Sequence, residues 1–278
     1  GIGNMTQGNS ISGMVQSNFH VPTWITGLVL AVLTGVVVIG GVKSIATICG
    51  KLVPFMAFFY IIGCIAIICI NHAYILPALK EIFSSAFSAR AAGGGFIGAS
   101  VITAARYGIA RGLFSNESGL GSAPIAAAAA QTRNPVRQAL VSMTGTFWDT
   151  VIVCALTGIV LVSSIIKDPV TLEGLSGGDL TSGAFNAIPG VGPIVLTIGL
   201  ITFAWSTILG WSYYGERAWE YLLGKKAIFP YRILWVIVVY IGCVTALDIV
   251  WNITDTLNAC MAFPNLISLL LLSGVIVS

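Results

Sequence analysis

The sequence predicts an all-α polytopic membrane protein. Apolar residues make up 56% of its 278 residues and charged residues only 8%, with a mean hydropathy of +0.95. An ordinary soluble domain carries roughly 25% charged residues, so this composition indicates that much of the chain lies in lipid. The apolar residues also gather in long runs, and a helix needs about 20 of them to cross a bilayer. Together these observations exclude a soluble globular domain.

Seven apolar runs are predicted to cross the membrane, at 22–41, 52–70, 100–131, 136–164, 190–214, 231–250 and 256–277. The sequence ILPALKEIFSSAF at 75–87, between the second and third runs, is amphipathic and too charged to cross. We expect it to form a helix on the membrane surface. Small residues four apart, such as Gly27, Ala31 and Gly35, would let neighbouring helices pack closely.

The distribution of lysine and arginine predicts the orientation of the chain. Most of them fall in the alternate loops at 42–51, 131–137 and 215–232. Cytoplasmic loops carry the excess of basic residues in membrane proteins, so these three loops are expected inside. The stretch 167–183 then lies outside, and the first crossing enters from outside.

The third run is interrupted by LFSNESGLGSAP at 113–124, which carries the carboxylate of Glu117. Its two halves, at about 100–114 and 122–131, are each too short to cross a bilayer alone. The two halves joined through the break are long enough to cross. Non-helical backbone at membrane depth is tolerated only where it is buried in protein or lines a cavity. The break is therefore predicted to form a pocket.

The ends of the two half-helices would present complementary partial charges. A helix ending at Phe114 would leave the last carbonyls, from Leu113 to Ser115, free to hold an ammonium group. A helix restarting near Ser122 would present amide hydrogens, and Gly119 would let a ligand approach the backbone. This pattern favours a small zwitterion such as an amino acid.

Other interpretations of the same residues remain open. The break could be a kink filled by neighbouring helices, with Glu117 capping the restarting helix. Asp149, inside an apolar run, could line a polar path or form a hydrogen bond in helix packing. The pattern alone fits a helical transporter or a channel. An enzyme is not expected because the spans hold no Ser–His, HExxH or paired-aspartate arrangement, and we expect no cofactor, metal site or nucleic-acid partner.

The sequence RYGIARGLFSNESGLGSAPIAAAAAQTRNPVRQALVSMTGTFWDT at 106–150 closely resembles the sodium:alanine/glycine symporter family of prokaryotes. So do GNMTQGNS at 3–10 and ILGWSYYGERAWEYL at 208–222. The resemblance implies a partial leucine-transporter-like inverted-repeat fold, holding about seven of its transmembrane helices, one of them broken. It implies that residues 1–278 form a single transporter domain, a fragment lacking the N-terminal helices and unable to transport by itself.

The resemblance also implies a function and a set of site residues. The function is secondary active symport of alanine or glycine with sodium or protons, by alternating access in the plasma membrane, the prokaryotic inner membrane. A proton-coupled transporter of the same superfamily with a different substrate is the alternative. The implied substrate-binding residues are Phe114, Gly119, Thr207, Trp211 and Gln7, and the implied sodium-binding residues are Ser206 and Thr207.

Overall fold

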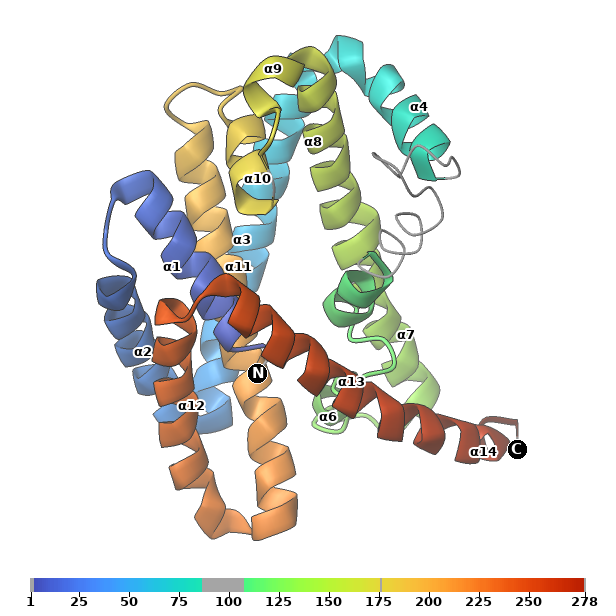
Figure 1. Cartoon of the computed structure of the whole chain (residues 1–278). Helices are drawn as coiled ribbons and strands as arrows, with labels where there is room; N and C mark the ends of the chain where they lie inside the picture. The colour runs from blue at the N-terminus through green and yellow to red at the C-terminus, as the bar shows by residue number, and fades with distance from the viewer. Residues whose placement is uncertain (1–2, 87–107, 176, 278) are drawn as a thin grey trace. The chain divides into compact units, whose positions relative to one another are not determined.

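The computed structural model describes residues 3–86, 108–175 and 177–277, and every regular element in those ranges is a helix (Figure 1). The elements are, in chain order, α1 (Met5–Phe19), α2 (Thr23–Ile39), α3 (Gly41–Ile70), η1 (His72–Tyr74), α4 (Ile75–Ala86), α6 (Ala123–Ala127), α7 (Pro135–Thr146), η3 (Phe147–Cys154), α8 (Ala155–Lys167), α9 (Pro169–Leu172), α10 (Gly177–Phe185), α11 (Gly192–Leu223), η4 (Lys225–Ala227), α12 (Ile228–Val244), α13 (Leu247–Leu271) and α14 (Ser273–Val277).

Four helices in the described ranges are long and apolar enough to cross a membrane: Gly41–Ile70, Pro135–Lys167, Gly192–Leu223 and Lys225–Val244. Thr23–Ile39 is apolar but shorter. The all-helical membrane class is therefore confirmed. The count of seven crossings and the leucine-transporter-like arrangement stay predictions, and residues 100–107 of the broken span lie outside the described ranges.

Two predicted boundaries are wrong. The loop expected at 42–51 is helical, because the chain turns within Gly40 and Gly41, the latter at φ +75°, and α3 starts at once. The last two spans meet at residues 245–246 rather than at 251–255, so Asp248 and Asp255 both lie within α13.

Contacts divide the chain into two compact units. Unit 1 comprises Gly1–Tyr60, Pro124–Ala128 and Ile194–Ser278, and unit 2 comprises Ile61–Ala123 and Ala129–Pro193. In unit 1, α12 packs along α2 and α1, and α1 also contacts α13. Its buried core joins α1, α2, α11 and α12 through residues that include Ile11, Leu30, Ile208 and Val239.

Helix α1 is polar for a membrane protein because its side chains bind the backbone of α12. Asn9 donates through Nδ2 to the carbonyls of Gly242 at 3.1 Å and Thr245 at 2.7 Å. Ser12 donates to the carbonyl of Cys243 at 2.9 Å. A Cβ added at Gly242 would lie 2.5 Å from the Cα of Met5, so only glycine allows this close approach.

A buried carboxylate joins the predicted cytoplasmic ends of unit 1. Glu216 is 2% exposed and accepts from Arg232 Nε at 2.7 Å and Nη2 at 3.1 Å, and from Arg217 at 2.9 Å. Arg232 also donates to the carbonyl of Ile39 at 3.0 Å. Removing a buried charge from water is costly unless it is paired, so these bonds fix α11, α12 and the end of α2 together.

Unit 2 is built on the continuous helical run α7, η3 and α8. Asn134 caps its start by accepting from the amides of Val136 at 2.9 Å and Arg137 at 3.2 Å, and Pro135 occupies the first turn. The middle of the run, η3, is a π-helix. The amphipathic segment expected at 75–87 is helix α4 over Ile75–Ala86, and it packs against α8.

Candidate functional site

The predicted helix break is present. Helix extends to Ser115, residues 116–122 are not helical, and α6 restarts the helix at Ala123 with Pro124 in its first turn. Proline is tolerated in a first turn because the amide hydrogen that it lacks would have no helical partner. The expected continuation to Gln131 is wrong, because α6 has only 5 residues and ends at Ala127.

The first half-helix ends in a Schellman cap. The amide of Ser118 donates to the carbonyl of Leu113 at 2.9 Å, and the amide of Glu117 donates to Phe114 at 3.1 Å. Glu117 occupies the left-handed position of this cap at φ +52°, where glycine is usual. The carbonyls of Leu113 and Phe114 each accept a backbone bond, so the expectation that they lack partners is wrong. Each carbonyl oxygen keeps a second lone pair, so a role in holding an ammonium group stays a prediction.

The two glycines of the break serve its backbone. Gly119 has φ +74° and Gly121 has φ +77°, a region that other residues adopt only at a cost. The sequence left open whether these glycines make room for a ligand or permit a kink. Their geometry accounts for both residues through the backbone alone, so a role of Gly119 toward substrate stays a prediction.

Two side-chain hydrogen bonds tie the break to the π-helix η3. Ser115 donates through Oγ to Asp149 Oδ2 at 2.5 Å, and Thr150 donates through Oγ1 to Asn116 Oδ1 at 2.8 Å. The last helical residue before the break and the first residue of the break thus bind consecutive residues of η3. Of the two roles left open for Asp149, the structure shows a hydrogen bond in helix packing. Turns of π-helix occur frequently at functional sites, and this one faces the predicted pocket sequence.

Three further residues of this region were not predicted as site residues. Asn116 and Thr150 form the second bond to η3, and nothing in their spacing signals that partnership. Ser122, which directly precedes α6, is 1% exposed, and its Oγ has no hydrogen-bond partner among the described residues. A buried hydroxyl without a partner is costly, so Ser122 is a position at which a bound polar group would be stabilised.

The hydroxyls expected to bind sodium lie together on α11. Ser206 is 8% exposed and donates to the carbonyl of Phe203 at 2.8 Å, and Thr207 donates to the same carbonyl at 3.0 Å. Serine and threonine often bond their own helix in this way. The hydroxyl oxygens keep lone pairs that a hard cation could use, so their ion-binding role stays a prediction.

Trp211 lies one turn beyond Thr207 and packs at the start of α1. A Cβ added at Gly3 would overlap the ring of Trp211, and Tyr214 meets that ring edge-on with centroids 5.5 Å apart.

The predicted site residues are divided between the two units. Unit 1 holds Gln7, on α1, together with Ser206, Thr207 and Trp211. Phe114 and Gly119 belong to unit 2.

Helices that can cross a membrane, together with a capped break inside an apolar sequence, define a multi-pass helical membrane protein. Comparison with known proteins makes the assignment more particular. The model of the sodium:alanine symporter family matches residues 1–278. The chain belongs to the sodium:alanine symporter family, as the resemblance at 106–150 implied, and hence to a family of transporters rather than of enzymes.

Individual relatives agree with this assignment. The chain is 55% identical over 278 residues to the sodium/alanine symporter AgcS of Methanococcus maripaludis, covering 100% of the chain and 60% of AgcS. It is 35% identical over 276 residues to the amino-acid carrier protein AlsT of Bacillus subtilis, covering 99% and 57%. It is 34% identical over 275 residues to the probable sodium/glutamine symporter GlnT of the same organism, covering 98% and 56%. The chain thus spans 60% or less of the length of these relatives.

Proposed function

We propose that the protein is a secondary active symporter that takes up a small neutral amino acid, alanine or glycine, together with sodium across the plasma membrane. The observation that carries this proposal is the 55% identity, over the whole chain, to a protein named as a sodium/alanine symporter. GlnT shares 34% identity and is named for glutamine, so the preference for a small substrate rests on the more similar relative.

The proposed fold is leucine-transporter-like, with residues 1–278 contributing to one transporter domain. Such folds place the substrate near the midplane, beside discontinuous helices whose ends carry partial charges. The capped break at 116–122 supplies one such helix end. Its bonds to Asp149 and Thr150 would hold it in a fixed position on η3 while substrate binds.

The proposed substrate contacts are those that the family resemblance implies. Phe114 and Trp211 supply aromatic contacts, Gln7 and Thr207 supply hydrogen bonds, and Gly119 keeps the break compact. Sodium would bind the oxygens of Ser206 and Thr207, since hard cations prefer neutral or anionic oxygen ligands. We add Ser122, because its buried hydroxyl lacks a hydrogen-bond partner in the described ranges and the residue directly precedes α6.

A specific observation favours a second candidate, coupling to protons in addition to or in place of sodium. One relative, YrbD of Bacillus subtilis, is 31% identical over 282 residues and is named a putative sodium/proton-dependent alanine carrier.

The test is uptake of labelled alanine into proteoliposomes that contain the full-length protein. We expect alanine to accumulate with an inward sodium gradient and not when potassium replaces sodium at the same membrane potential. The driving force is sufficient, since one cation moving down 100 mV yields about 2.3 kcal/mol. Accumulation that follows an imposed pH gradient without sodium would select the proton-coupled alternative, and gradient-independent equilibration would indicate a channel.

A further inference from the structure

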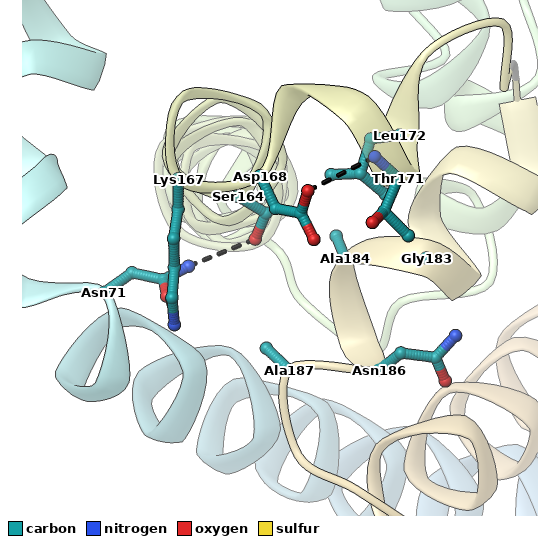
Figure 2. A pocket seen from close by; sticks show the side chains of 10 residues that line it. All are labelled: Asn71, Ser164, Lys167, Asp168, Thr171, Leu172, Gly183, Ala184, Asn186 and Ala187. Carbon is teal, nitrogen blue, oxygen red and sulfur yellow. Dashed lines mark hydrogen bonds between the residues drawn. The ribbon is translucent and has the colours of Figure 1, made fainter.

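Unit 2 contains a cavity of about 270 Å³ that none of the predicted site residues lines. It lies among the end of α3, the end of α8, and the short helices α9 and α10 (Figure 2). These segments fall at or beside the loops that the charge distribution places outside the membrane. This volume is large enough for several water molecules or for one small amino acid.

One wall of the cavity carries an ammonium group held by a buried polar network. Asn71 is 0% exposed and donates through Nδ2 to Ser164 at 3.1 Å. Its Oδ1 accepts from Lys167 Nζ at 3.0 Å. This bond uses one of the three donors of the ammonium, so two others can bind a ligand. Asn71 thereby fixes the position of a positive charge at the edge of the cavity (Figure 2).

The next residue supplies a fixed negative charge. Asp168 accepts from the amide of Thr171 at 3.2 Å and so caps α9. Hydrogen bonds from Thr171 hold the pKa of Asp168 below its usual range, so this carboxylate is charged at neutral pH. The remaining lining is mainly small and apolar, from Leu172, Gly183, Ala184 and Ala187, with the amide of Asn186 beside it.

We propose that this cavity is an outer binding site for an amino-acid zwitterion, distinct from the predicted transport site. The ammonium of Lys167 would bind the carboxylate of the ligand, the carboxylate of Asp168 its amino group, and the apolar lining a short side chain. The identity of the ligand as the transported amino acid rests on the proposed function. The site would collect substrate at the outer face before the transport step.

A purely structural role for the same residues makes a different prediction. Lys167 and Asp168 could serve only to join α3 to α8 and to cap α9. Asp168→Asn keeps an oxygen that can accept from Thr171 and removes the charge. Lys167→Gln keeps a donor and removes the charge. Neutralisation that spares the fold should therefore weaken only a charge-dependent site.

The experiment measures equilibrium binding of labelled alanine to the purified full-length protein in sodium buffer. We expect two classes of site, of which the weaker falls about fivefold or more in affinity in Lys167→Gln and Asp168→Asn. Fivefold corresponds to about 1 kcal/mol, the upper range for an exposed ion pair. Lys167→Arg, which keeps the positive charge, should retain the affinity of the weaker class. Lys80→Gln and Asp179→Asn are matched controls, since both residues are exposed and neither lines the cavity.

Competition identifies the ligand class. Lactate lacks the amino group and alaninamide lacks the carboxylate, so neither should displace alanine from the weaker class. The proposal is overturned if the wild type shows a single class of site, or if lactate displaces alanine from the weaker class. Sodium-driven uptake by the same wild-type preparation tests the proposed function separately, because its persistence alongside a single binding class would leave symport standing and remove only the outer site.

Discussion

Glu117 shows how much one residue can constrain the break. Its left-handed conformation, at φ +52°, closes the Schellman cap through its own amide and that of Ser118. A residue other than glycine in this region costs of order 1–3 kcal/mol, and such strain concentrates at functional sites. The sequence offered Glu117 as a possible cap of the helix that follows, whereas its backbone caps the helix that precedes it.

Gly119→Ala separates the two roles open to this glycine. Because Gly119 has φ +74°, we expect the substitution to lower the free energy of unfolding by about 1 kcal/mol. Thermal unfolding of the purified full-length protein measures it, with Gly145→Ala, a helical glycine of α7, as the control. If Gly119→Ala leaves stability unchanged and shifts uptake from alanine toward glycine, the residue shapes the substrate pocket instead.

Thr207→Ala should raise the sodium concentration for half-maximal uptake severalfold, with less effect on the affinity for alanine. The reason is that it removes an oxygen from the proposed cation site but only one hydrogen bond to the carbonyl of Phe203. Thr202→Ala is a close control, since Thr202 bonds the carbonyl of Ile198 in the same helix at 2.7 Å. An unchanged sodium requirement with a collapsed alanine affinity would remove Thr207 from the ion site.

At the scale of elements, the break and η3 should behave as one unit. We expect Ser115→Ala and Asp149→Ala to be non-additive, with a coupling free energy of about 1–2 kcal/mol, because each removes the same short hydrogen bond. Unfolding of the single and double variants gives this value. Thr144→Ala serves as control, as its hydroxyl bonds only a nearby carbonyl of α7. Full additivity of the two substitutions would show that the bond contributes nothing.

The ion cluster of α11 and α12 gives a second prediction at this scale. Arg232→Leu should destabilise the protein by about 3 kcal/mol, because it leaves the buried carboxylate of Glu216 without the partner that donates two hydrogen bonds to it. Arg217 is 36% exposed, so Arg217→Leu should cost no more than about 1 kcal/mol. Thermal unfolding of the two variants measures the two losses of stability. Equal losses for the two arginines would contradict the geometry.

At the scale of the whole molecule, the basic residues predict which ends of the helices face the cytoplasm. A cysteine replacing Asp179 should react with a membrane-impermeant maleimide in intact cells. A cysteine replacing Lys226 should react only after the cells are permeabilised, because it lies in a predicted inner loop. The unsubstituted protein gives the background from its native cysteines. The reverse pattern would invert the topology and place the cavity beside Lys167 inside.

Particular residues show which features of the fold could be predicted from the sequence and which could not. The break was predictable because Asn116, Gly119 and Gly121 interrupt an apolar run, and glycine and asparagine disfavour a continuous helix. The start of α13 was not, because the spans predicted at 231–250 and 256–277 put their connection at 251–255, whereas the chain forms it at 245–246. The π-helix at Phe147–Cys154 has no signal in the local pattern, which is that of an ordinary apolar helix.

The membrane class, the family and the place of the break follow from the sequence, since they depend on composition, on motif identity and on local backbone preference. The tertiary structure decided which groups are already bonded. It showed that the carbonyls of Leu113 and Phe114 accept cap bonds, that Asp149 binds Ser115, and that Asn71 positions Lys167. Hydrogen bonds between residues far apart in the chain depend on how helices pack, and no local pattern encodes that packing.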